Sequence, residues 1–103
     1  MITVWLPKAI STRDAQLVYI AENNPVAAIE HGDMLAQQVN QLSAYPELGR
    51  AGRKQGTREL VISRTSFVVT YRVKPKAKRI EILRVLHSSQ QWPQVKINDI
   101  YVL

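Results

Sequence analysis

The sequence predicts an α+β domain: an N-terminal strand, then an antiparallel helix hairpin packed on a C-terminal antiparallel β-sheet. Three observations predict this. A β-branched and aromatic run occupies residues 2–6, two helix-like segments follow it before residue 45, and three strand-like runs lie after residue 58. Helices and strands segregated along the chain are typical of α+β folds. A chain of 103 residues supports one hydrophobic core, so residues 1–103 are expected to form a single domain.

The first predicted strand, "ITVWL" at residues 2–6, is stopped by Pro7. A helix follows. It begins either at Ser11, whose side-chain oxygen together with Asp14 could cap the first turn, or soon after Pro7. Leu17 and Ile20 then lie on one face of this helix.

The segment "NNP" at residues 23–25 ends the first helix and starts a second, with Asn24 as the expected N-cap and Pro25 at the first helical position. Apolar or small residues at spacings of three and four form a stripe along it: Ala28, Gly32, Leu35, Val39 and Leu42. The short connection predicts an antiparallel helix hairpin. His31 has no matching ligand pair nearby and is interpreted as a surface or helix-packing residue.

Residues 45–59, "YPELGRAGRKQGTRE", are predicted to form a loop because they contain three glycines and a proline. The glycines match neither the Walker pattern nor the dinucleotide fingerprint. The loop also carries four cations, which are candidate contacts to an anion, whether a phosphate or an acidic protein segment: Arg50, Arg53, Lys54 and Arg58.

The runs "ELVIS", "FVVTYRV" and "RIEILRVLH" are predicted strands, the last two joined by "KPKAKR". One register gathers the large apolar side chains on one face. It pairs Val73 with Ile80, Tyr71 with Ile82, Val69 with Arg84, Phe67 with Leu86 and, on the opposite face, Arg72 with Glu81. This register places His87 on the same face as Arg72, and Arg84 on the other. Residues 94–103 are expected to form a further edge strand or a docking tail.

Charge is unevenly distributed along the chain. Residues 1–49 have a net charge of −3, whereas residues 50–103 have a net charge of +9. The basic half therefore favours a polyanionic or acidic partner. A second group of cations, Lys74, Lys76, Lys78 and Arg79, falls at a hairpin turn and is interpreted as solvated.

The absence of cysteine excludes a disulfide framework and a thiolate zinc site. No metal and no cofactor are expected. The N-terminal residues resemble neither a signal peptide nor a membrane span, so we expect a cytoplasmic protein with no membrane partner.

Four blocks in order, "YPELGR", "GTREL", "VVTYRV" and "IEILRVLH", resemble the RelE/ParE superfamily of toxins from bacterial type II toxin–antitoxin systems. The resemblance covers roughly residues 2–90. It implies a plasmid-stabilisation type of toxin that arrests growth and is held inactive by direct binding of a cognate antitoxin, with a toxin–antitoxin hetero-oligomer or a dimer as the expected assembly.

The resemblance leaves two targets open. RelE-like members cut mRNA on the ribosome, whereas ParE-like members inhibit DNA gyrase. Aligning the RelE-type strands with this sequence puts Glu59, Val61 and Val68 where that nuclease has basic residues, which slightly favours the ParE-like branch. Metal-independent RNA cleavage needs a general base, a general acid and cations around the phosphorane.

If the protein is nevertheless a nuclease, its candidate catalytic residues are His87, Arg72 and Arg84. The competing interpretation is that "RVLH" is an architectural block of the fold and that His87 is structural. A third hypothesis, from a different class, is a DNA-associated partner module without toxicity.

Overall fold

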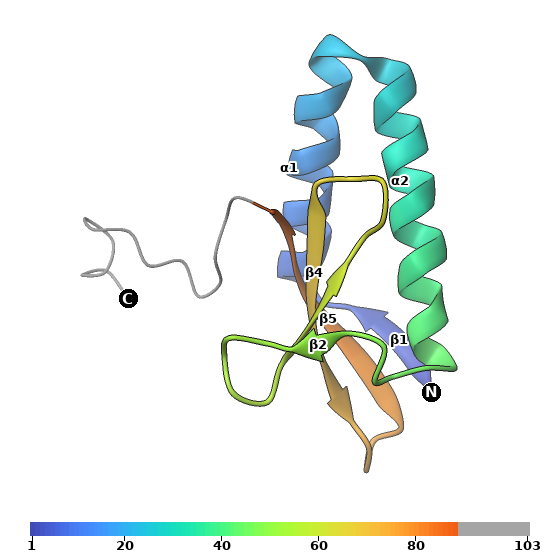
Figure 1. The fold of residues 1–103 in the computed structure, drawn as a ribbon, viewed down its shortest axis with the longest axis vertical. Helices are drawn as coiled ribbons and strands as arrows, with labels where there is room; N and C mark the ends of the chain where they lie inside the picture. The colour runs from blue at the N-terminus through green and yellow to red at the C-terminus, as the bar shows by residue number, and fades with distance from the viewer. Residues whose placement is uncertain (89–103) are drawn as a thin grey trace, which may run out of the picture.

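The structure is a computed structural model, and it describes residues 1–88. The elements follow in the order β1 (Ile2–Trp5), α1 (Pro7–Asn23), α2 (Pro25–Asn40), the 3-10 turn η1 (Gln41–Ser43), β2 (Arg50–Ala51), β3 (Arg58–Val61), β4 (Phe67–Lys74) and β5 (Arg79–His87). Figure 1 shows the two helices as a hairpin standing against the sheet. The predicted α+β arrangement is confirmed. The expected tail at residues 94–103 lies outside the described residues.

Each helix of the hairpin begins at a proline, Pro7 in α1 and Pro25 in α2. The first helix starts at Pro7, with Leu6 as N-cap, and so begins before Ser11. The side chains of Ser11 and Thr12 donate back to the carbonyl of Lys8 instead of capping. Asn24 caps α2 as predicted, because its Oδ1 accepts a hydrogen bond from the N–H of Ala27 at 3.1 Å.

The five strands form one sheet in the order β1-β5-β4-β3-β2. The N-terminal strand lies at one edge and pairs parallel to β5, while the other pairs are antiparallel. Where β1 ends, α1 continues to cover the edge of β5: the hydroxyl of Thr12 accepts a hydrogen bond from the N–H of Val85 at 2.9 Å. A side chain of α1 thus provides the hydrogen-bond acceptor for β5 at a position beyond the end of β1.

The register of the central hairpin is correct in its first half and wrong in its second. Arg72 lies opposite Glu81 and Tyr71 opposite Ile82, as predicted, but a β-bulge follows between Thr70 and Tyr71. Leu83 is the extra residue. Beyond it the pairs are Thr70 with Arg84, Val69 with Val85, Val68 with Leu86 and Phe67 with His87. Because each residue on a strand faces opposite to its neighbour, the bulge exchanges the faces expected for Arg84 and His87.

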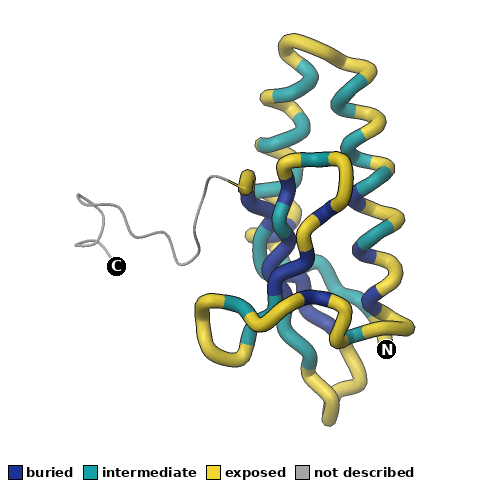
Figure 2. Tube along the Cα trace, viewed as in Figure 1, coloured by how far each residue is buried: buried dark blue, intermediate teal, exposed yellow. Residues whose placement is uncertain are grey.

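The core lies between the helices and one face of the sheet. It combines Leu35 and Val39 of α2, Leu42 of η1 and alternate residues of the two long strands, namely Phe67, Val69, Tyr71, Ile80, Ile82 and Val85. Figure 2 shows this buried layer along the strands and the helix sides that face them. His31 contacts Phe67 edge-to-face at 5.9 Å between ring centroids, which agrees with its interpretation as a packing residue.

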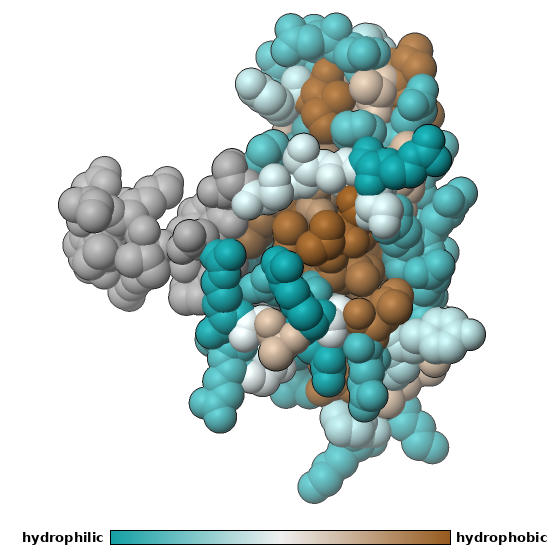
Figure 3. Space-filling view, viewed as in Figure 1, coloured by the Kyte–Doolittle hydropathy of each residue, from teal (hydrophilic) through white to brown (hydrophobic). Residues whose placement is uncertain are grey.

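The connected ends of the two helices expose apolar side chains. Val18, Tyr19, Val26 and Ile29 are each 60% or more exposed, and all lie close to the α1–α2 connection. Figure 3 shows apolar groups at this end of the molecule and another apolar area over the middle of the sheet layer. Within residues 1–88, neither helix has the length and apolarity that crossing a membrane would require.

Candidate functional site

The sheet face that points away from the helices, here called the outer face, collects most of the charged strand residues. Cross-strand partners point to the same side, so the pairs Arg72–Glu81, Lys74–Arg79, Thr70–Arg84 and Glu59–Thr70 all belong to it. Arg50 of β2 is opposite Glu59 and joins the same face. The sequence analysis singled out Arg50, Arg72 and Arg84, and the structure brings all three onto this one face.

Residues 45–59 are not the continuous loop that the sequence predicted: β2 interrupts them at Arg50–Ala51, and β3 begins at Arg58 because this segment pairs with β4. Glu59 of β3 ties the basic part of this segment to the outer face. Only 9% of the Glu59 side chain is exposed. Its carboxylate accepts hydrogen bonds from Arg50 Nη2 at 3.1 Å and from the backbone N–H of Arg53 at 3.3 Å. With two such donors this carboxylate has hydrogen-bond partners although it is nearly buried. The resemblance had marked position 59 only as the place where a basic group is missing. The structure gives it a role in positioning Arg50 and Arg53.

Tyr71 and Arg58 hold the start of the same loop from the inner side. The Tyr71 hydroxyl donates to the carbonyl of Pro46 and accepts from the N–H of Gly49, both at 2.8 Å. Arg58 Nη1 donates to the carbonyl of Gly49 at 2.8 Å. Burial raises the pKa of Tyr71 above its usual 10.0, so the hydroxyl stays a hydrogen-bond donor at neutral pH.

Glu81 organises the other end of the outer face. Arg72 Nε donates to one carboxylate oxygen at 2.6 Å, and Arg79 donates to the other through Nε at 2.9 Å and Nη2 at 2.7 Å. The hydrogen bond from Arg72, supported by that from Arg79, lowers the pKa of Glu81 below its usual 4.5. Glu81 is therefore an ionised anchor at neutral pH and is unsuited to act as a general acid.

This pKa shift predicts a pH dependence of stability. Because the pKa of Glu81 is lower in the folded state, its contribution is present above pH 4.5 and is lost as the pH falls through the folded value. Urea melts between pH 7 and pH 3 should therefore show a steeper loss of unfolding free energy for the wild type than for Glu81→Gln. Equal slopes for the two proteins would contradict this assignment.

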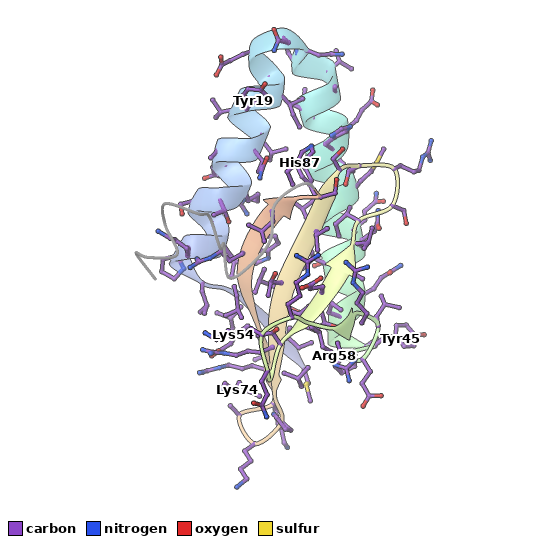
Figure 4. All side chains as sticks on the ribbon, turned by 60° about the vertical axis from the view of Figure 1, so that its left-hand side comes forward. Tyr19, Tyr45, Lys54, Arg58, Lys74 and His87 are labelled. Atoms are coloured by element: carbon purple, nitrogen blue, oxygen red, sulfur yellow. The ribbon has the colours of Figure 1, made fainter. Side chains whose placement is uncertain are left out.

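His87 faces the other side of the sheet from Arg72 and Arg84. Its cross-strand partner is Phe67, a core residue on the inner side of the sheet, whereas Arg72 and Arg84 are on the outer face. Figure 4 shows His87 at the end of the sheet near the helix hairpin, with Lys54 and Lys74 toward the opposite end. The expected sharing of one face by His87 and Arg72 is thus wrong, and the bulge at Leu83 is the reason.

The chemistry available at the outer face is anion binding. The guanidinium groups of Arg50, Arg72 and Arg79 are fixed by the carboxylates of Glu59 and Glu81, which are thereby already engaged. Within residues 1–88, no three histidine or acidic side chains gather as metal ligands would. The pairing of Arg72 with Glu81 was predicted from the sequence. The roles of Glu59, Thr70 and Arg79 were missed because each depends on cross-strand neighbours, although the alternation of charge in "TYRVK" and "RIEIL" was a usable signal.

The family model described as "ParE toxin of type II toxin-antitoxin system, parDE" matches residues 3–92. The chain belongs to this family. A curated relative named "Putative toxin Y4kP", from Sinorhizobium fredii, is 37% identical over 91 residues, covering 88% of this chain and 92% of its own length. A solved structure titled "Chromosomal ParDE TA system from P. aeruginosa" has a TM-score of 0.75 and 30% identity, and the match covers 84% of this chain and 95% of that one.

Membership of the ParE family confirms the resemblance drawn from the four sequence blocks and selects its ParE-like branch. The protein is a toxin of a ParDE-type toxin–antitoxin system, and the family implies an antitoxin partner. The structural match also agrees with the strand, helix hairpin and sheet described above.

Proposed function

We propose that this ParE-family toxin arrests bacterial growth by acting on DNA gyrase in the cytoplasm, and that its cognate antitoxin neutralises it by direct binding. The observation that carries the proposal is the separation of His87 from the arginines. Metal-independent RNA cleavage needs a proton donor beside the cations that stabilise the phosphorane. His87 pairs with Phe67, on the side of the sheet away from Arg72 and Arg84.

The surfaces available for binding support two kinds of contact. The loop that carries Arg50, Arg53 and Lys54 is cationic and suits an acidic segment of the antitoxin or an anionic part of the target. The exposed apolar side chains near the α1–α2 connection, from Val18 to Ile29, suit an amphipathic antitoxin segment. Arg58 acts mainly through the loop, since it donates to the carbonyl of Gly49. A toxin–antitoxin hetero-oligomer is the expected assembly.

The proposal is tested by inducing the protein alone and then together with its cognate antitoxin. Growth arrest that is relieved by the antitoxin, and inhibition of supercoiling when purified toxin is added to purified gyrase, are the expected results. Normal growth at confirmed expression would contradict the toxin activity. Arrest with unaffected gyrase and with cleaved mRNA by primer extension would instead favour the ribosome-dependent endonuclease.

A substitution at His87 separates the two mechanisms sharply. His87→Ala is expected to arrest growth as strongly as the wild type, because the proposed mechanism uses no proton transfer. Removal of a general acid from a nuclease would lower the cleavage rate by roughly 10²–10⁴-fold. Growth curves at matched expression, with circular dichroism to verify folding, are the measurement. Loss of arrest in a folded variant would overturn the proposal.

A further inference from the structure

The outer face is strongly cationic. Among the described residues its basic side chains are Arg50, Arg53, Arg72, Lys74, Arg79 and Arg84, and its acidic ones are Glu59 and Glu81. The positive charges therefore outnumber the negative ones, and both carboxylates are buried beneath arginine side chains. The charge that this face presents to solvent is therefore positive, while its end beside Val61 and Val68 is apolar.

The arginines on this face are held in place and still have donors to offer. The side chains of Arg50, Arg72 and Arg79 are 59%, 41% and 48% exposed, while Glu59 and Glu81 beneath them are 9% and 5% exposed. A guanidinium carries five N–H donors, and the contacts to the carboxylates use one or two. The remaining donors are directed to solvent by groups that have already lost their conformational freedom, which favours a second anion.

A buried hydroxyl adds a specific contact point. Thr70 is 1% exposed, and its Oγ1 has no hydrogen-bond partner within residues 1–88. It lines a small cavity of about 20 Å³ together with Arg50, Arg53 and Glu59. A cavity of this size accommodates one oxygen-sized group. The Glu59 carboxylate lines the same cavity and would repel a phosphate oxygen there, so the cavity suits one water, which could accept from Thr70 and donate to a phosphate held by the arginines.

We propose that the outer face binds the phosphate backbone of duplex DNA without base specificity. The basic side chains Arg72 and Lys74 of β4 are two residues apart, or about 7 Å, which is close to the phosphate repeat of a nucleic-acid strand, and Arg79 and Arg84 of β5 lie beside this strand. The aromatic residues of β4, Phe67 and Tyr71, lie in the core. Without an aromatic platform on this face, stacked single-stranded bases have no partner, and phosphates are the available ligand.

The inference extends the proposed function, because gyrase bound to DNA would offer this toxin both a protein surface and a duplex. Duplex binding by the outer face can nevertheless be measured without gyrase. It is tested with the purified full-length chain and a fluorescently labelled duplex of random sequence, by anisotropy at several salt concentrations. We expect binding at low salt that weakens steeply with added salt and is unaffected by sequence. No duplex binding at low salt would overturn the inference.

The decisive variant is Arg72→Gln/Arg79→Gln/Glu81→Gln. It removes two guanidinium groups without leaving Glu81 as a buried unpaired charge, and it lowers the net charge by one. The slope of log Kd against log salt should fall by roughly two, with roughly tenfold or greater loss of affinity. Arg50→Gln/Glu59→Gln, which removes the Arg50 guanidinium together with the nearly buried carboxylate that it contacts, provides an independent variant if the triple substitution does not fold.

Lys8→Gln is the matched control. It also lowers the net charge by one, but Lys8 lies in α1, in the helix layer. Its binding should resemble that of the wild type, and a loss equal to that of the triple variant would show that overall charge alone is responsible. A polyglutamate peptide added as competitor should displace DNA poorly. If it binds this face and the duplex does not, the surface recognises an acidic protein segment and the inference is wrong.

Discussion

Replacing Gly49 with alanine should lower the free energy of unfolding by roughly 3 kcal/mol. A Cβ added at Gly49 would lie 2.7 Å from Cε1 and Oη of Tyr71 and 2.8 Å from the carbonyl oxygen of Glu59. The oxygen belongs to strand β3 and the ring to the core, so neither can move without disturbing its own neighbours. The shift would also weaken the hydrogen bond between Gly49 and Tyr71.

The measurement is urea denaturation of Gly49→Ala against the wild type, with Gly32→Ala as the control. At Gly32, which lies within helix α2, the added Cβ would meet only Leu17, at 3.6 Å, an ordinary contact. Alanine there should stabilise the protein by up to about 1 kcal/mol, because glycine is unfavourable inside a helix. A Gly49→Ala variant that unfolds at the wild-type midpoint would contradict the close approach of loop and ring.

Tyr71→Phe is expected to cost about 2–3 kcal/mol. The substitution preserves the ring that fills the core but removes the hydroxyl that joins Pro46 to Gly49. The N–H of Gly49 and the carbonyl of Pro46 are then left without that partner, and unpaired buried polar groups carry most of the penalty. The loop with Arg50 and Arg53 should become more mobile, so hydrogen exchange at residues 46–53 should accelerate.

Tyr45→Phe is the control for this prediction, because Tyr45 is 64% exposed and its substitution should change stability by less than about 0.5 kcal/mol. The pH dependence provides a second check. The raised pKa of Tyr71 means that its contribution is fully present below pH 10.0 and is lost as the pH rises through the folded value. Wild-type stability should therefore fall at alkaline pH more steeply than that of Tyr71→Phe. Parallel curves would contradict this.

Local chemistry made the elements predictable. Pro7 and the Asn24–Pro25 pair set the ends of the helices, and the apolar stripe of α2 correctly predicted Leu35 and Val39 as core residues. The strand-like runs after residue 58 coincide closely with β3, β4 and β5. Four sequence blocks were enough to predict the family that the comparisons show.

The candidate site was less predictable, because it depends on contacts between distant segments. The pairing of Arg72 with Glu81 could be predicted, but Glu59 and Thr70 are ordinary strand residues in the sequence, and only the pairing of β3 with β2 and of β4 with β5 places them among arginines. The binding role of the cations Arg50, Arg53, Lys54 and Arg58 stays a prediction, and only the fold shows that Arg58 donates to the carbonyl of Gly49. The catalytic roles of His87, Arg72 and Arg84 stay a prediction for the nuclease alternative.

By itself, the sequence determined the helix hairpin, the strands, the family and the concentration of positive charge in residues 50–103. Only the tertiary structure decided which face of the sheet receives His87. Ile82 and Leu83 are both apolar, so alternation along β5 cannot show which of them is the bulged residue. The N–H of Val85 hydrogen-bonds to Thr12 of α1, a contact between groups 73 residues apart in the chain. Long-range contacts of this kind cannot be read from the local sequence pattern. They occur together with the register that places His87 on the inner face of the sheet and Arg72 and Arg84 on the outer face.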